Sequence, residues 1–354
     1  MNTKFNYYSL NNPAEISNWE NKIFNASFYS FDRLALELFQ FQYLHNNLYR
    51  QYVDSVGTDP ERVDSITKIP FLPIQFFKTS VIKTTDFNPQ ITFESSGTTQ
   101  TSNSKHYVKN LDLYRSSFTK CFELFYGLEK EWCILALLPS YLERKNSLPA
   151  GKDSSLIVMT EELIKRSGHP LSGFYLKNNE KLYQTLLHNE ILKQSTLLIG
   201  VTYALLDFIE DYSMQLSHTV IMETGGMKGR REEITRDEVH EAIIKKLGVD
   251  KVHSEYGMTE ILSQAYSRGK GIFKCPPWMK VLIRSEDDPF SIQTNPLIAK
   301  QTENGIINII DLANIYSCAF IATDDMGRLH HNDSFEVLGR CDNSDIRGCS
   351  LLVS

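Results

Sequence analysis

The chain has 354 residues, 42% of them hydrophobic and 23% charged, with a formal net charge of −6. These values support one or two globular domains with a sizeable core, and no basic stripe with interleaved aromatic residues points to nucleic acid as a partner. The N-terminus lacks the apolar core of a signal peptide and the apolar runs are too short to span a bilayer, so we expect a cytoplasmic protein without a membrane span. Six cysteines without a C-x-x-C pair are expected to be free thiols.

The first part of the chain is predicted to form a layer of helices. Apolar side chains recur at helical spacing from Phe31 to Tyr52, and the Gly-Thr-Asp-Pro sequence at 57–60 then ends the helix. The proline- and phenylalanine-rich segment 70–77 follows as an irregular connection, whose side chains we assign to packing. The helical layer is therefore placed at residues 1–69.

Strands and helices alternate through the middle of the chain, which indicates a largely parallel α/β sheet. Helices are expected over 111–125, 155–165 and 203–212, and strands over 132–138, 196–201 and 219–223. A capping box at 235–238 opens a further helix that should end near Gly248. From Lys280 on, apolar runs follow one another without intervening helices and predict a β-rich lobe.

Residues 91–106 indicate a strand that runs into a polar loop. Four hydroxyl side chains and Gly97 follow the extended stretch. The glycine permits backbone N–H groups to converge on phosphate oxygens, and Lys105 adds a positive charge to the loop. A kinase-type P-loop does not fit, because Lys105 lies eight residues beyond the single glycine. Composition alone favours a solvated turn, and a second stretch reverses that interpretation. The hydroxyl groups belong to Ser95, Ser96, Thr98 and Thr99.

The second stretch is residues 253–260, with the sequence HSEYGMTE. Tyr256 offers an aromatic face to a base, Thr259 a hydroxyl to a phosphate, and Glu260 a carboxylate to a hard cation. Together with the Ser/Thr loop, this stretch resembles the adenylate-forming superfamily of acyl-CoA synthetases, luciferases and peptide-synthetase adenylation domains. In that family S-S-G-T-T-x…K clamps the triphosphate, and Y-G-x-T-E places Tyr against adenine, Thr at the α-phosphate and Glu at Mg²⁺.

The resemblance implies a fold and a set of site residues. The fold is α/β, the large N-terminal domain of adenylate-forming enzymes, with mainly parallel sheets and helices plus a β-rich lobe. ATP is the implied substrate and Mg²⁺ the implied metal, held by Glu260, which shares the catalytic role with Lys105 and Cys349. The implied nucleotide-binding residues are Ser95, Ser96, Gly97, Thr98, Thr99, Gly225, Gly226, Tyr256, Gly257, Thr259, Asp325 and Arg340.

Two further stretches each allow two interpretations. Gly225 and Gly226 follow a predicted strand in a position that resembles the superfamily's adenine-side loop, but Gly-Gly after a strand is also an ordinary turn. Residues 138–144 and 154–159 resemble the acyl-protein synthetases that supply activated fatty acids in bacterial luminescence. If the resemblance to that family holds, Tyr141 either lines the acyl-binding site or is a structural tyrosine after a strand.

The last part of the chain resembles the end of the superfamily's large domain. Residues 322–328 match the T-G-D ribose-binding element, with Asp325 at the aspartate and Asp324 in place of the glycine, and a carboxylate can accept from both ribose hydroxyls. Residues 339–348 resemble the hinge before the family's small C-terminal domain. We therefore expect an adenylation domain at 1–338, a vestigial hinge and tail at 339–354, and no mobile C-terminal domain.

The tail indicates how the acyl group leaves the enzyme. Acyl-protein synthetases transfer it to a cysteine near their own C-terminus, a position that Cys349 matches, and Arg347 and Arg340 are expected to lower the pKa of that thiol. Cys341 is the competing acceptor. The resemblance implies a fatty acid substrate and an acyl reductase partner. Three alternatives remain: transfer to coenzyme A or a carrier protein, a C-terminal domain supplied in trans, and a non-enzymatic nucleotide binder that docks a reductase.

Overall fold

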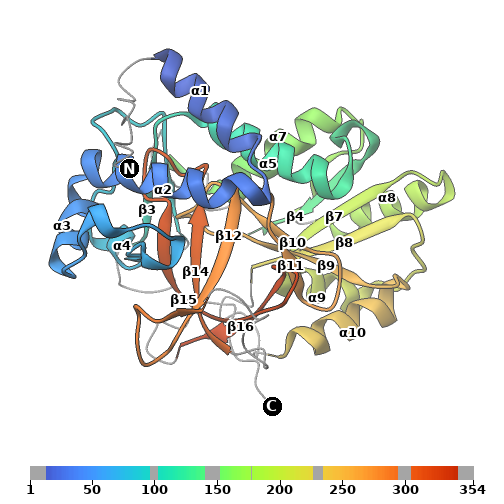
Figure 1. Cartoon of the computed structure of the whole chain (residues 1–354). Coiled ribbons are helices and arrows are strands. Elements are labelled where there is room, and N and C mark those ends of the chain that lie inside the picture. Colours follow the sequence, from blue (N-terminus) through green and yellow to red (C-terminus); the bar gives the residue numbers. More distant parts are fainter. Residues whose placement is uncertain are drawn as a thin grey trace.

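The computed structural model describes residues 13–95, 103–139, 152–176, 178–225, 234–293 and 304–341. Figure 1 shows helices α1 to α4 beside one end of a long sheet and helices α8 to α10 at the other end. The expected layer of helices is confirmed, with one difference. The helix predicted from Phe31 to Tyr52 is two helices, because Asn46 ends the first and its side chain accepts a 3.0 Å hydrogen bond from the Tyr49 N–H of the second. The elements are α1 (Pro13–Phe24), α2 (Phe28–His45), α3 (Asn47–Ser55), the short η1 (Pro60–Arg62) and η2 (Ile66–Lys68), and α4 (Phe76–Thr79).

Five strands form the parallel half of the sheet, in the order β6-β4-β7-β8-β9. These strands include continuous apolar runs, because helices cover both faces of this half of the sheet. In the view of Figure 1, α5 and α7 lie above it and α9 and α10 below it. The predicted alternation is confirmed, whereas α8 was not predicted. The strands are β4 (Cys133–Leu137), β6 (Gly173–Phe174), β7 (Thr196–Val201), β8 (Thr219–Thr224) and β9 (Val252–Tyr256), and the helices are α5 (Leu111–Tyr126), η3 (Glu129–Glu131), α7 (Ser155–Ser167), α8 (Asn179–Ile191), α9 (Thr202–Asp211) and α10 (Arg236–Leu247).

The capping box that opens α10 is present as predicted. The Thr235 hydroxyl accepts from the Glu238 N–H at 3.1 Å, and the Glu238 carboxylate accepts from the Thr235 N–H at 2.7 Å. Gly248 ends the helix with a φ of 64°, a left-handed conformation that glycine adopts at little cost.

The predicted β-rich lobe is confirmed, and it is antiparallel. It continues the same sheet, because β9 pairs with β10 and the order runs on through β11, β16, β15, β14, β12 and β13, with β1 added in parallel to β15. The described residues thus contain one large mixed sheet and a small one of order β3-β2-β5. The strands are β1 (Leu72–Pro73), β10 (Ala265–Ser267), β11 (Ile272–Lys274), β12 (Met279–Arg284), β13 (Ile292–Gln293), β14 (Asn304–Asp311), β15 (Phe320–Leu329) and β16 (Phe335–Arg340), and in the small sheet β2 (Ile91–Glu94), β3 (Lys105–Val108) and β5 (Lys152–Asp153).

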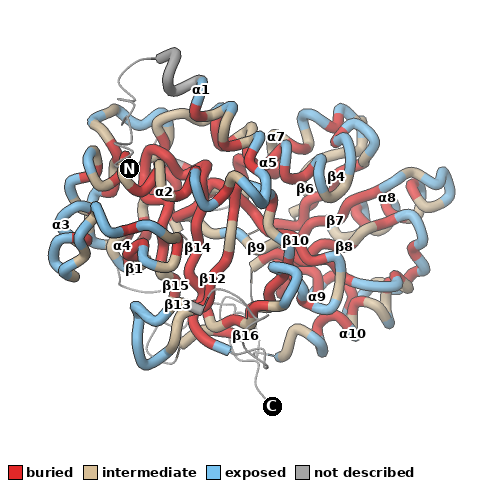
Figure 2. Tube along the Cα trace, in the orientation of Figure 1, coloured by how far each residue is buried: buried red, intermediate tan, exposed pale blue. Residues whose placement is uncertain are grey.

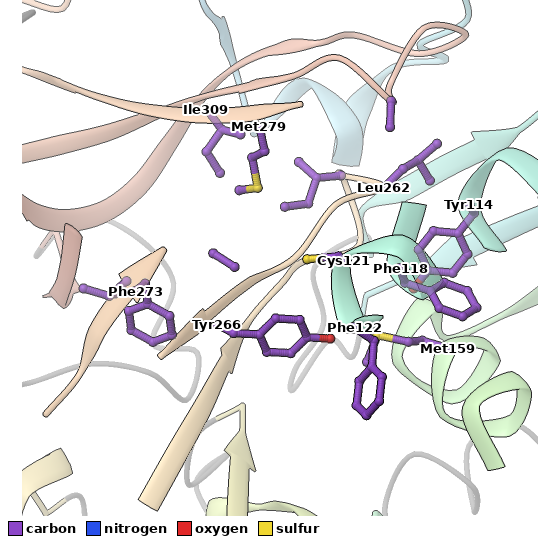
Figure 3. Packing of buried hydrophobic residues seen from close by; sticks show 14 of the residues in the cluster. Tyr114, Phe118, Cys121, Phe122, Met159, Leu262, Tyr266, Phe273, Met279 and Ile309 are labelled. Carbon is purple, nitrogen blue, oxygen red and sulfur yellow. The ribbon is translucent and has the colours of Figure 1, made fainter. Parts of the chain in front are cut away.

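The core runs along the whole sheet, where Figure 2 shows the strands buried and the outer turns of the helices exposed. Between the two halves, Phe118 and Phe122 of α5 gather with Met159 of α7 and Tyr266 of β10 (Figure 3). Within the described part of the chain no helix has both the length and the apolar composition to cross a membrane. The cysteines there are free thiols, as expected: Cys121, Cys133, Cys275, Cys318 and Cys341.

Gln42 fastens the helical layer to the sheet. Its buried amide nitrogen donates to the carbonyl oxygens of Asn314 and Ile315, both at 2.9 Å, and its oxygen accepts from the Ala319 N–H at 2.9 Å. These backbone groups lie in the turn between β14 and β15 and are buried, so each needs a partner. One side chain of α2 therefore satisfies three buried backbone groups of that turn.

Replacing Gln42 with Leu should lower the free energy of unfolding by at least about 2 kcal/mol, because a buried polar group left unpaired costs about 1–3 kcal/mol. Gln40→Leu is the matched control on the same helix. It removes a single part-buried bond to the Pro60 carbonyl and should cost clearly less. Urea unfolding monitored by circular dichroism measures both variants, and equal midpoints would show that Gln42 does not hold the turn.

Candidate active site

Three side chains that are far apart in the sequence meet where the parallel half of the sheet joins the antiparallel half. The Tyr256 hydroxyl at the end of β9 donates to Asp325 Oδ2 at 2.7 Å, and Arg340 Nε of β16 lies 3.1 Å from Asp325 Oδ1. Asp325 and Arg340 face each other in the register of β15 and β16. The carboxylate is buried, and its two oxygens have a phenol and a guanidinium as partners. The residues predicted for the base, Tyr256, and for the ribose, Asp325, thus meet, and Arg340 of the predicted nucleotide-binding set contacts the same carboxylate.

Gly257 follows Tyr256 where the side chain of Glu255 lies close to the backbone. A Cβ atom there would overlap Oε1 of Glu255 and would lie 3.5 Å from Cγ of Gln264. The glycine is exposed, so the backbone beside Tyr256 is open to a ligand. Glycine here lets the Glu255 carboxylate keep its position, since a larger residue would require that carboxylate to move.

The base of the Ser/Thr loop is a closed hairpin. Ser95 and Ser104 face each other, with the Ser95 N–H donating to the Ser104 carbonyl at 3.0 Å and the Ser104 N–H to the Ser95 hydroxyl at 2.9 Å. Lys105 opens β3 directly opposite Glu94 of β2. The hairpin thereby holds Ser95 and Lys105 at the two ends of the loop.

Glu260 lies beside this hairpin. Its carboxyl group is buried and is hydrogen-bonded by the Ser104 side chain. Burial raises the pKa of Glu260 above its ordinary value, and the Ser104 hydrogen bond and the charge of Arg340 oppose that rise. The predicted metal residue is thus within the electrostatic reach of both Arg340 and Asp325.

His106 ties the hairpin to the Tyr256–Glu260 segment, a role that sequence reasoning missed. Its Nδ1 lies 2.9 Å from the Thr259 carbonyl oxygen. Burial lowers the pKa of His106 to about 4, so the ring is neutral at pH 7 and Nδ1 must carry the proton that it donates to the carbonyl. A strand residue next to Lys105 therefore fixes the backbone of Thr259.

Gly225 is held at the carboxyl end of β8. Its φ is 68°, and its carbonyl oxygen lies 2.6 Å from the Thr202 hydroxyl of α9, which is also 2.9 Å from Glu223 Oε2. Ser254 of β9 donates to the other oxygen of Glu223 at 3.2 Å. The buried Glu223 thus connects β8, β9 and α9 directly behind the predicted adenine-side loop.

Arg236 extends this connection to the antiparallel half. Its guanidinium lies 3.6 Å from Glu223, donates to the Val337 carbonyl of β16 at 3.0 Å, and stacks 5.5 Å from the Phe273 ring. Burial opposes the charge on Glu223, yet the adjacent His240 and Arg236 lower its pKa below the ordinary value. An ionised, paired Glu223 therefore joins the two halves behind the Tyr256–Asp325 contact.

The structure brings together most of the predicted residues that it describes: Ser95 and Lys105 at the hairpin, Glu260 beside them, and Tyr256, Asp325 and Arg340 in mutual contact. Gly225 ends the neighbouring strand β8, which pairs with β9. The remaining predicted residues lie outside the described ranges: Ser96, Gly97, Thr98, Thr99, Tyr141, Gly226 and Cys349.

A Mg²⁺ ion fits Glu260 as one of few protein ligands. Over the described ranges, no three His, Cys, Asp or Glu side chains gather in a way that could hold a metal ion. Magnesium commonly binds through one or two carboxylates together with substrate phosphates and water. A single buried carboxyl beside a loop of phosphate-binding composition is consistent with that mode.

Three of the solved structures to which this chain is similar are ligases or synthetases. The chain aligns with 2-hydroxyisobutyryl-CoA ligase in complex with 2-HIB-AMP at a TM-score of 0.58 and 11% identity, covering 91% of this chain and 70% of that one. ATP-bound MatB from Rhodopseudomonas palustris matches with a TM-score of 0.46 and 14% identity over 70% of this chain and 47% of its own. O-succinylbenzoate coenzyme A synthetase from Bacillus subtilis, solved with ATP and magnesium ion, matches with a TM-score of 0.44 and 16% identity over 74% and 53%.

The chain spans about half the length of the first solved structures it matches, 49% and 47%. The search of curated proteins found no match. The 2-hydroxyisobutyryl-CoA ligase alignment shows the fold of the large domain of adenylate-forming enzymes, as predicted. The family model described as acyl-protein synthetase, LuxE, matches residues 12–354. With almost its whole length matched, and with the adenylate-forming fold around the Tyr256–Asp325 contact, this chain belongs to the LuxE family of acyl-protein synthetases.

Proposed function

We propose that this protein condenses a fatty acid with MgATP to give an acyl adenylate and then transfers the acyl group to its own Cys349, from which an acyl reductase partner receives it. The observation that carries the first step is the convergence at one sheet junction of Tyr256, Asp325 and Arg340 with Glu260 and the hairpin that bears Lys105. Each of these groups matches a chemical part of MgATP. Family membership supports the acyl-protein part of the proposal.

In the first step a carboxylate oxygen of the acid attacks the α-phosphorus of ATP. The bond from that phosphorus to the bridging oxygen breaks, and pyrophosphate leaves. Lys105 and the loop hydroxyls hold the β- and γ-phosphates, Tyr256 binds the base and Asp325 the ribose. Glu260 would hold Mg²⁺, which neutralises phosphate charge when bound. Catalysis here is mostly positioning and charge neutralisation.

In the second step a thiolate attacks the carbonyl carbon of the acyl adenylate. A C–S bond forms, the bond from carbon to the phosphate oxygen breaks, AMP leaves, and the thiol proton passes to water. Cys341 is the less suitable acceptor, because burial raises the pKa of its thiol and the thiolate is the attacking form. Its N–H is also hydrogen-bonded to the Asp324 carbonyl at 3.0 Å, which keeps it in line with β16. Cys349 is the proposed nucleophile.

Transfer to coenzyme A or a carrier-protein thiol is the second candidate. The similarity to coenzyme A ligases favours it, since those proteins share the fold. Incubation with ATP and a fatty acid, followed by intact-mass measurement, separates the two candidates: an acyl adduct on the protein supports Cys349, and acylation of an added thiol alone supports the second. Neither product would indicate a nucleotide binder or a module completed in trans.

Lys105→Ala should lower carboxylate-dependent ATP–pyrophosphate exchange by more than about tenfold, since a charged contact to a desolvated phosphate contributes at least ~1.4 kcal/mol. Lys109→Ala, four residues further on, is the matched control. Its ammonium lies 4.4 Å from the Tyr316 ring centroid, and it has no proposed phosphate role. Equal exchange rates in the two variants would remove Lys105 from the site.

Glu260→Gln keeps the shape of the side chain and deletes its charge. The concentration of Mg²⁺ needed for half-maximal exchange should rise, because a neutral amide is a poorer magnesium ligand than a carboxylate. Glu241→Gln, at an exposed position of α10, controls for the loss of one negative charge. Superimposable Mg²⁺ titrations of the two variants would mean that Glu260 is not a metal ligand.

Cys349→Ser should still exchange pyrophosphate but acquire no hydroxylamine-labile acyl label, because a serine hydroxyl without an adjacent base is a far weaker nucleophile. Cys341→Ser should label normally. Label that persists in Cys349→Ser and disappears in Cys341→Ser would move the acceptor eight residues earlier. Label in both variants would place the acceptor elsewhere in the chain.

A further inference from the structure

Beside Tyr256 lies a pair of hydrogen-bond acceptors that the proposed adenylation chemistry does not use. Glu255 is partly exposed near the end of strand β9, and its Oε2 accepts from the Thr224 hydroxyl of β8 at 2.5 Å. Its Oε1 lies against Gly257, where a Cβ atom would overlap it. Burial raises the pKa of Glu255 to about 7. One carboxyl oxygen is thus fixed by Thr224, and the other points to the open backbone at Gly257.

Gln264 adds a second acceptor at the same place. Its side chain borders Gly257 from the opposite strand, because Ala265 pairs with Tyr256 and Gln264 therefore comes next to Gly257. The residue is only 4% exposed, yet its Oε1 is buried without a hydrogen-bond partner in the described structure. A buried amide oxygen without a donor costs about 1–3 kcal/mol, so its retention calls for an explanation. The two side chains that border Gly257 thus include one acceptor oxygen, Gln264 Oε1, without a hydrogen-bond donor in the described structure.

The two acceptors lie on the side of β9 that faces away from the proposed nucleotide. Successive strand residues point to opposite faces, so Glu255 projects away from the face on which Tyr256 meets Asp325. On the Glu255 face, β10 contributes Tyr266 directly opposite Glu255. Burial raises the pKa of Tyr114 and of Cys121 in α5, and the nearby Glu255 carboxylate adds to both rises. Figure 3 shows that Tyr266, Cys121 and Tyr114 belong to one apolar cluster. The acceptors therefore lie at the border of the buried apolar core.

We propose that Glu255 and Gln264 bind a hydrogen-bond donor carried by the carboxylic acid substrate, a hydroxyl or an ammonium group, so that the enzyme selects a hydroxy or amino acid over the unsubstituted acid of the same length. The inference rests on the proposed acid activation. The base and ribose have partners on the Tyr256 face, and the acid is the remaining reactant for the Glu255 face. Apolar side chains would contact its hydrocarbon part, and the two acceptors fix its polar group.

The test is ATP–pyrophosphate exchange with acids of one chain length that differ only in the position of a single hydroxyl or amino group, with the unsubstituted acid as reference. A site built to bind a donor rejects the analogue that lacks it, so kcat/KM for the best substituted acid should exceed that for the unsubstituted acid by at least about tenfold.

Gln264→Leu removes the unpaired amide without leaving a cavity and should abolish this preference. Glu255→Gln keeps an acceptor oxygen but loses the charge, so it should weaken use of an amino acid by more than about tenfold and that of a hydroxy acid less.

Thr219→Val is the matched control. It removes another buried, unpaired polar atom, at the opposite end of β8, and should keep the wild-type preference. Exchange that is equal or faster with the unsubstituted acid would overturn the donor site and leave the proposed activation intact. A preference that survives in Gln264→Leu would also overturn it. No exchange with any acid, while the protein remains folded, would overturn both proposals.

Discussion

The continuity of one hydrogen-bonded sheet is the constraint on which the candidate site depends. Five parallel strands pass into an antiparallel set through β9, β10, β11 and β16, and the register of these pairs fixes which residues become neighbours. Tyr256 and Asp325 are 69 residues apart in sequence and 2.7 Å apart in space for this reason. A slip of one residue in any of these pairs would turn the side chains to the other face of the sheet. The site is therefore a product of strand register.

A series of buried polar contacts supports that junction from the N-terminal side. Gln42 of α2 donates to the Asn314 carbonyl, and the Asn314 amide in turn donates to the Glu260 carbonyl and to the Cys318 carbonyl, both at 2.8 Å. His106 holds the carbonyl of the neighbouring Thr259. The backbone that bears Glu260 is thus fixed by side chains from three separate parts of the chain. Buried hydrogen bonds of this kind restrict the movement of the backbone that they hold, which suits a site that works by positioning.

The sequence allowed the elements and the motif residues to be predicted, because periodicity, a capping box and two loop motifs are local patterns. The helix break at Asn46 was not predicted, because the helical apolar pattern continues from α2 into α3. The cap that separates the two helices depends on one side-chain contact, from Asn46 to the Tyr49 N–H. His106, Glu223 and Arg236 were not assigned, as their partners lie on other strands and helices. Gln264 could not be found from sequence at all: only three-dimensional burial shows that its amide oxygen lacks a donor.

The hydrogen bond from the Cys341 N–H to the Asp324 carbonyl has a kinetic consequence for the proposed acyl transfer. It fixes Cys341, the last residue that the structure describes, and a chain of eight residues can reach at most roughly 28 Å from that point. A thiol tethered within that radius meets the acyl adenylate of its own molecule at an effective concentration that short flexible tethers place in the millimolar range. Transfer to Cys349 would then follow first-order kinetics, with a rate constant that does not change when the protein is diluted.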